Sequence, residues 1–521
     1  MGKATGLDRR DFLKGVAAAA LTAGFIGTGE ARALASPKGW AHSQENILPQ
    51  TLQPHPTIHG SRNSEHFWEK VRQTFVLPDN YIHMNTGTTG SQPLFSLSNL
   101  AVYNLYKSRD PKDWEANLHN DFPELFPVSA SILGTSALAS RQAAVAAQYG
   151  ANPDEIVLSY NTTDACNLIF AGTPWNPGDR IITTHWEHPA LDGPMAWARD
   201  YHHVDIKIVE LPSNFTSAMT VDDILHLFKH ELKQDFPSGA KQYVAFSEIF
   251  YKNGLRMPVK ELCALARAYG AYSIVDSAHS WGMLPVNCHD YGADFIAGAG
   301  HKWLCGGPGT GIFYVRNSGE NLPPFAMGNF FLYGNGDLFT VPSPNYDTRT
   351  WMFGGPSTYV QLRGEANTPA LYAMTDSAAY FNYMGVQDIY NRGVQLGNYL
   401  KARIKHQWGP NSLWVQKNHD PSFASALTSF NPFTGKDDAD QFAAMNTAMN
   451  AVLAQLASED PKIYLRTTTW HDRATDTADN RVGFRISTHG VYNNYNQIDY
   501  MFERLVAAID TAATANGLTQ L

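Results

Sequence analysis

Short apolar runs alternate with helix-like patterns from about residue 150 to residue 315. Runs of this kind are typical of strands that are covered on both faces. They are Ile156–Leu158, Ile181–Thr184, Tyr243–Phe246, Tyr272–Val275, Phe295–Ala297 and Gly311–Val315. Strands that alternate with helices predict a mostly parallel sheet covered on both faces, which is an α/β fold.

Two helices are predicted from their apolar spacing. In residues 259–269 the apolar side chains are spaced so that they share one face of a helix, and Gly270 ends the pattern. A second helix is expected from about Tyr500 to Asp510. Its apolar stripe consists of Ile498, Met501, Phe502, Leu505 and Ile509.

The chain of 521 residues exceeds what one hydrophobic core usually serves, so two domains are expected. We assign residues 76–365 to a large domain and residues 366–521 to a smaller C-terminal α/β domain, with residues 36–75 as an arm. Residues 317–360 are rich in Pro, Gly and aromatic residues, which fits either an active-site flap or a surface excursion.

Composition excludes some functions and leaves enzymes open. The chain has 44% apolar and 17% charged residues and a net charge of −9, which argues against non-specific nucleic-acid binding. Its four cysteines match no disulfide or zinc spacing, so we expect buried thiols and no metal site.

The first 35 residues have the features of an export signal. Arg9-Arg10-Asp11-Phe12-Leu13-Lys14 resembles a twin-arginine motif, and the apolar run from Val16 to Ile26 is too short to span a membrane. Ala33-Leu34-Ala35 offers small residues for cleavage, although a retained anchor is the alternative. We expect transport of the folded protein by the twin-arginine translocase to the periplasm or medium, and no membrane span in the mature protein.

One lysine stands out by its context. Lys302 follows a predicted strand and precedes the glycine-rich stretch from Gly306 to Gly311. A lysine at such a position is a candidate for imine chemistry if burial lowers the pKa of its amine. Taken alone, a lysine is normally a solvated surface group.

Polar residues follow other predicted strands. Asp276 and His279 come after the strand at 272–275, where Asp276 is either a partner for a ring nitrogen, a helix cap or a metal ligand. Thr162 and Thr163 begin a predicted helix, which suits either a phosphate or ordinary capping. His188 follows the strand at 181–184 and fits either ring stacking or a structural role.

Arg485 alternates with apolar neighbours in a strand-like run. An inward-facing arginine needs an anionic partner, which is either a substrate carboxylate or an internal salt bridge. Together with the residues above, it meets the needs of pyridoxal phosphate (PLP), which requires an anchored phosphate, a protonated pyridine nitrogen, a tethered aldehyde and a bound substrate carboxylate. The carboxyl ends of strands in open α/β sheets are where such ligands bind.

The stretch from Val275-Asp276-Ser277-Ala278-His279 through His301-Lys302-Trp303 to Gly309-Thr310-Gly311 resembles the class V aminotransferase family of fold-type-I PLP enzymes. The resemblance implies a seven-stranded, mostly parallel sheet and a homodimer. It makes Lys302 the Schiff-base lysine and general base, pairs Asp276 with the pyridine nitrogen and stacks His188 on the ring.

The resemblance also assigns phosphate contacts and substrate contacts. Thr162 and Thr163 bind the phosphate, supported by His301, and Thr368 reaches the phosphate of the partner subunit. The run 484–487 resembles the carboxylate-binding strand. Two departures weaken parts of this assignment, because Ala299 replaces a usual serine and Asn367 a usual glycine.

Two features bear on the reaction. His279 resembles the isopenicillin N epimerase-like branch, and the export signal invites comparison with periplasmic PLP enzymes that tailor siderophore peptides such as pyoverdine. Cysteine desulfurases of the family need a cysteine on a loop before the arginine strand, and the expected loop, residues 466–472, contains none. We therefore expect an enzyme other than a desulfurase.

The hypothesis from sequence is an exported PLP enzyme acting on an amino acid or a peptide amine, with transamination favoured. Epimerisation and elimination on the same cofactor remain open. So do a non-catalytic PLP-binding protein and a secreted binding protein without a cofactor.

Overall fold

A computed structural model describes residues 51–125, 137–212, 215, 218–325, 366–416, 420, 422–473 and 476–521. The predicted signal at 1–35 and most of the 317–360 excursion lie outside these ranges. Export therefore stays a prediction. Among the helices of the described part, none is long and apolar enough to cross a membrane.

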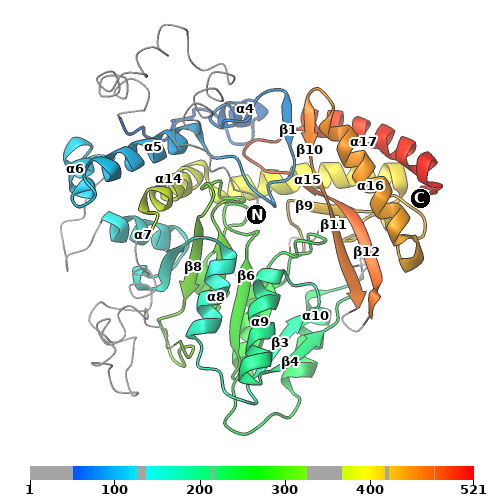
Figure 1. Cartoon of the computed structure of the whole chain (residues 1–521), viewed down its shortest axis with the longest axis horizontal. Coiled ribbons are helices and arrows are strands. Elements are labelled where there is room, and N and C mark those ends of the chain that lie inside the picture. Colours follow the sequence, from blue (N-terminus) through cyan, green and yellow to red (C-terminus); the bar gives the residue numbers. More distant parts are fainter. Residues whose placement is uncertain are drawn as a thin grey trace, which may run out of the picture.

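A seven-stranded sheet forms the lower half of the molecule in the view of Figure 1. Its strand order is β2-β8-β7-β6-β5-β3-β4, and every pairing is parallel except those of β8 with β2 and β7. The strands are β2 (Ile156–Ser159), β3 (Arg180–Thr184), β4 (Asp205–Val209), β5 (Gln242–Ser247), β6 (Tyr272–Ser277), β7 (Phe295–Ala299) and β8 (Gly311–Val315). The predicted fold class is confirmed.

Helices cover both faces of this sheet because successive strand residues point to opposite sides. On one face, side chains such as Ile181 pack against α8 (Thr162–Gly172) and α9 (Pro189–His202). On the other, side chains such as Ile182 pack with α10 (Val221–Leu232) and α11 (Val259–Ala268). The sheet is thus buried on both sides, as its apolar runs predict.

The C-terminal part has its own core, at the upper right of Figure 1. A three-stranded antiparallel sheet of order β11-β12-β9 packs with three helices. These elements are β9 (Leu427–Phe430), β11 (Arg466–Arg473), β12 (Asp476–Ser487), α15 (Val386–Trp408), α16 (Phe442–Ala457) and α17 (Tyr495–Asn516). The predicted apolar stripe of the last helix is buried, but α17 is longer than the 500–510 expected.

Segments from the N-terminal region join both cores. The predicted arm contains α4 (Glu65–Arg72), whose Phe67, Trp68 and Val71 are buried. The short strand β1 (Tyr81–His83) pairs in parallel with β10 (Lys462–Tyr464) of the C-terminal part. This pairing carries residues 85–90, which follow β1, to the edge where the sheet strands end.

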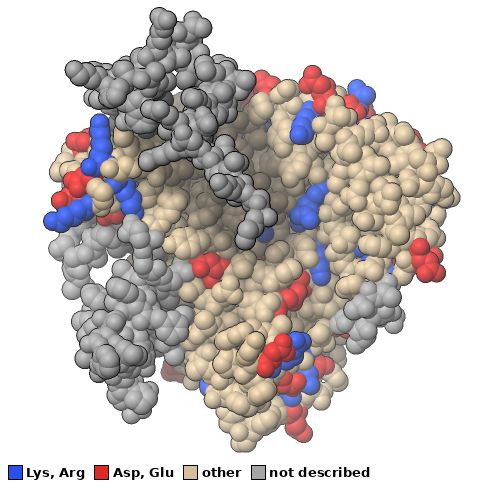
Figure 2. All heavy atoms as spheres, viewed as in Figure 1, with Lys and Arg blue, Asp and Glu red and all other residues tan. Residues whose placement is uncertain are grey.

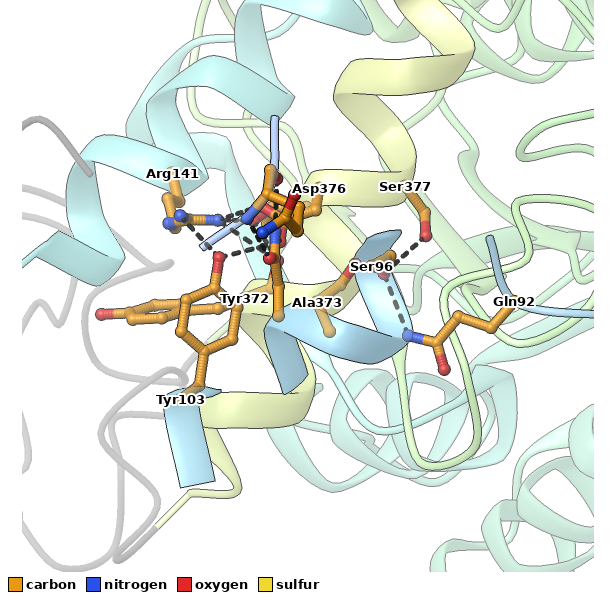
Figure 3. A network of polar contacts seen from close by, with 11 residues as sticks. Gln92, Ser96, Tyr103, Arg141, Tyr372, Ala373, Asp376 and Ser377 are labelled. Carbon is orange, nitrogen blue, oxygen red and sulfur yellow. Dashed lines mark hydrogen bonds and ion pairs between the residues drawn. The ribbon is translucent and has the colours of Figure 1, made fainter. Parts of the chain in front are cut away.

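Two helices complete the upper left of the molecule (Figure 1). They are α5 (Leu94–Arg109) and α14 (Thr368–Met384), and a polar network joins them to α7 (Ala137–Gln148). In Figure 3, Arg141 of α7 points at Asp376 of α14, with an ion pair of 2.7 Å, while Tyr103 of α5 donates to the same carboxylate at 2.8 Å. The network fixes the direction of α14 and so the place of Thr368 at its start.

Candidate active site

A cavity of about 770 Å³ opens where the strands of the large sheet end. Its lining includes seven of the nine predicted site residues: Thr162, Thr163, His188, His279, His301, Lys302 and Arg485. Figure 2 shows that the face of the molecule in Figure 1 is hollowed near its middle and is mostly uncharged elsewhere. Thr162, His188, His279 and Lys302 meet here because each follows a strand of the large sheet, and Arg485 joins them from β12 of the C-terminal sheet.

Lys302 and Asp276 are the chemical centre of this cavity. Burial lowers the pKa of the Lys302 amine to about 8, although the negative charge of Asp276 raises it, and the positive charges of Arg485 and Arg466 lower it further. Asp276, near the end of β6, is 3% exposed and is not among the lining residues, but its charge acts on Lys302. Burial raises its pKa, while the backbone N–H of Ala278, at 2.8 Å, and Lys302 favour its ionised form.

The backbone of Gly90 lies close to the turn that carries Lys302. The N–H of Gly90 donates to the carbonyl of His301 at 2.8 Å. A Cβ atom at position 90 would lie 2.1 Å from the Lys302 carbonyl oxygen, so only glycine fits. The segment after β1 thus helps to hold the turn that carries Lys302.

The ring of His279 has a defined tautomer. Its Nδ1 lies 3.0 Å from the indole nitrogen of Trp303, which can only donate, so Nδ1 accepts. Burial lowers the pKa of His279 well below its usual value, so the ring is neutral and Nε2 carries the proton. This Nε2 is buried without a partner among the described residues, and His279 lines the cavity, where a ligand oxygen can accept from it.

The start of α8 forms one end of the cavity. Asn161 caps the helix by accepting from the N–H of Asp164 at 2.8 Å, so the capping role falls to Asn161. The hydroxyl of Thr162 is buried and has no hydrogen-bond partner among the described residues. First-turn N–H groups lack partners within the helix, and together with this hydroxyl they suit a phosphate.

Two further histidines line the cavity, and each contacts one backbone group through its Nδ1 atom. Nδ1 of His188 accepts from the N–H of Ala190 at 3.0 Å, and its ring lies edge-on to Tyr251 at 4.8 Å. Burial, followed by the charges of Lys302 and Arg485, lowers the pKa of His188 to about 4, so a neutral ring faces the cavity. His301 lies with Nδ1 3.4 Å from the carbonyl of Thr310.

Arg485 is a buried cation with only neutral partners. It is 2% exposed and donates to the carbonyl of Tyr251 at 3.2 Å, the side chain of Asn85 at 3.1 Å and the hydroxyl of Thr88 at 2.9 Å. No carboxylate of the described residues lies within ion-pair distance, so the internal salt bridge considered from sequence is not found there. Burial lowers the pKa of Arg485 to about 9, and an anion bound in the cavity would offset the cost of burying this charge.

Thr368 lies apart from this cavity within the chain. It begins α14, and its hydroxyl lies 3.3 Å from the carbonyl of Ala366. A contact to the cofactor of a second subunit, as expected from the resemblance, remains a prediction.

Sequence reasoning missed several cavity residues. Thr88, Tyr251 and Arg466 line the cavity, and Asn85 holds Arg485. Arg466 escaped notice because residues 466–472 were interpreted as a loop, whereas they form β11, paired along β12. The run of three threonines at 467–469 followed by Trp470 was the available signal, because β-branched and aromatic residues favour strands.

Residues 112–498 match the family model described as aminotransferase class-V. The chain belongs to the class V aminotransferase family. A probable cysteine desulfurase of Methanothermobacter thermautotrophicus is 25% identical over 364 residues, 70% of this chain and 81% of that protein. Isopenicillin N epimerase of Streptomyces clavuligerus is 25% identical over 255 residues, but these cover only 48% of this chain and 56% of the epimerase.

Among solved structures, the apo cysteine desulfurase of Thermococcus onnurineus superimposes with a TM-score of 0.58 at 20% identity, covering 86% of this chain and 98% of that one. This similarity shows the shared fold. The cofactor expectation is confirmed by the family: this class V enzyme uses PLP. The unpartnered Thr162 hydroxyl and His279 Nε2 fit its phosphate and ring oxygen.

The expectation that the protein is not a cysteine desulfurase is contradicted. Cysteine desulfurases are prominent among both the relatives and the structural neighbours of this class V enzyme. The expectation relied on a cysteine missing from a loop that is in fact strand β11. A C–S bond can also break with its electrons leaving on sulfur, so a protein thiol at one position does not decide the matter.

The pKa of Lys302 predicts how the cofactor attaches. Only the neutral amine bonds to the PLP aldehyde, and with a pKa of about 8 roughly a tenth of it is neutral at pH 7. We expect the rate at which PLP absorbance changes on adding PLP to cofactor-free protein to rise with pH up to about 8 and then level off. A rate that keeps rising about tenfold per pH unit to pH 10 would contradict the lowered pKa.

Proposed function

We propose that this class V enzyme removes the α-proton of an amino acid, or of an amino-acid unit in a larger compound, whose carboxylate binds Arg485. The observation that carries the proposal is a buried guanidinium, without a carboxylate partner among the described residues, in the same cavity as Lys302. A substrate carboxylate would satisfy the unpartnered Nε of Arg485.

PLP, when bound, withdraws electrons from the substrate Cα. The chain's residues do the rest. Lys302, with a pKa of about 8, accepts the α-proton near neutral pH, where a base of this strength is effective. Asp276 would supply the negative charge that keeps the pyridine nitrogen protonated, and His279 would donate a hydrogen bond from Nε2. Arg485 orients the substrate so that Cα faces the lysine.

Of the reactions that can follow removal of the α-proton, we favour transamination. One base is enough for it, because the proton moves between two carbons on the same face. Lys302 is the lysine among the cavity-lining residues, and the neutral His188, with a pKa of about 4, is a poor second acid for epimerisation. Cleavage of a C–S bond is the second candidate, favoured by the desulfurase relatives. A single-turnover assay with cysteine distinguishes them: release of sulfide or sulfane sulfur supports C–S cleavage, and one equivalent of 2-oxo acid without sulfur release supports transamination.

Solvent exchange tests the shared step directly. The protein, incubated with PLP and a panel of amino acids in D₂O, is expected to place deuterium at Cα of at least one of them, measured by NMR. A protein that binds PLP yet exchanges no α-proton of any amino acid or amino-terminal peptide would reject the proposed function.

Replacing Arg485 by lysine keeps the charge but removes the planar fork. We expect KM for the amino acid to rise roughly 10- to 100-fold, the cost of losing a hydrogen bond to a charged group, with a smaller change in kcat. Arg481→Lys is the matched control, because Arg481 is also buried on β12 but lies near Asp437. An unchanged KM in Arg485→Lys would remove this residue from substrate binding.

A further inference from the structure

Two arginines, not one, face the cavity. Arg466 is opposite Arg485 in the antiparallel register of β11 and β12. Residues directly opposite each other in such a pair project to the same face of the sheet. Both line the cavity, so the side that carries Arg485 holds a second guanidinium.

One hydroxyl joins the two guanidinium groups. Thr88 Oγ1 accepts from Nη2 of Arg485 at 2.9 Å and from Nη1 of Arg466 at 3.3 Å. Thr88 follows β1 and is positioned by Asn85, whose side chain accepts from its hydroxyl at 2.9 Å. The two guanidinium groups are therefore linked through one oxygen atom, Thr88 Oγ1.

Nothing in the described part of the chain balances this charge. No carboxylate among the described residues lies within ion-pair distance of Arg466 or of Arg485, and the charge of Arg466 lowers the pKa of both Arg485 and Lys302. Like charges directly opposite each other destabilise a sheet. One substrate α-carboxylate would neutralise only one of the two.

We propose that Arg466 binds a second carboxylate of the substrate, so that the enzyme acts on amino acids with an acidic side chain. Arg485 is buried and takes the α-carboxylate, while Arg466 lies at the exposed end of the cavity, where a side chain of the substrate extends. This inference rests on the proposed function and adds the substrate class to it.

Isosteric acids and amides provide the probe. Glutamate and aspartate are titrated into the PLP-loaded enzyme beside glutamine and asparagine, and the dissociation constants are taken from the change in cofactor absorbance. We expect at least one acid to bind roughly 10- to 100-fold more tightly than its amide, as for a hydrogen-bonded charge pair. Arg466→Gln should remove that preference by weakening the acid and leaving the amide unchanged.

Two variants distinguish a failure of this inference from a failure of the proposed function. Lys462→Gln makes the same charge change at an exposed position of β10 outside the cavity lining, and the preference should persist. Arg485→Lys should weaken acid and amide alike. Equal affinity for acid and amide, or a preference that survives Arg466→Gln, overturns this inference while leaving the proposed function in place. Absence of any absorbance change with all four compounds, together with absence of α-proton exchange, overturns both.

Discussion

Replacing Lys302 by alanine is expected to lower turnover by at least about 10²- to 10⁴-fold, the usual contribution of a positioned acid–base group. The loss has two causes, because the same amine accepts the α-proton and holds the cofactor. Treatment with borohydride should fix PLP to one lysine of the wild type, and peptide mapping should find it at residue 302. In Lys302→Ala the fixed adduct should be absent.

Lys401 is the matched control for this experiment. It is 4% exposed in α15, and burial lowers its pKa to about 8, as for Lys302. It has no place in the cavity lining. If a low pKa alone made a lysine reactive, Lys401 would also be trapped. We expect Lys401→Met to retain both adduct and activity; an adduct that maps to residue 401, or that persists in Lys302→Ala, would refute the assignment.

The central sheet was predictable because its signals are local. Each buried strand is a short apolar run, and the strand-end rule then places the polar residues that follow 158, 184, 275 and 297 at one edge. The rule applies however far apart in the sequence the strands lie. It accounts for the presence of Thr162, His188, His279 and Lys302 in one cavity.

The carboxylate side of the cavity was harder to predict because its contacts are remote in sequence. Arg485 receives support from Asn85 and Thr88, 400 and 397 residues away. That contact depends on β1 pairing with β10, and a three-residue strand has too few residues to show a periodic pattern. Arg466 was missed for a related reason, since a polar strand such as β11 lacks the apolar run that marked the others.

The substitution Asp276→Asn is expected to reduce kcat by roughly 10²- to 10³-fold, with the fold preserved because asparagine has the same shape. The carboxylate lies at the end of β6, 3% exposed, and accepts the N–H of Ala278 at 2.8 Å, an interaction that an amide oxygen can keep. What the variant loses is the negative charge that keeps the pyridine nitrogen protonated. PLP should still attach to Lys302, so the adduct after borohydride remains while turnover falls.

Asp294→Asn serves as the control for removing a buried carboxylate. Asp294 is also 3% exposed, but it lies at the start of β7, at the opposite edge of the sheet, and pairs with Arg316 at 2.7 Å. Its replacement should lower the melting temperature, because it leaves a buried cation unpaired, while kcat of the folded protein stays near wild type. The reverse pattern is expected for Asp276→Asn. Near-normal kcat in that variant would exclude Asp276 from the reaction, since a buried charge that merely stabilised the fold would reveal itself in the melting temperature alone.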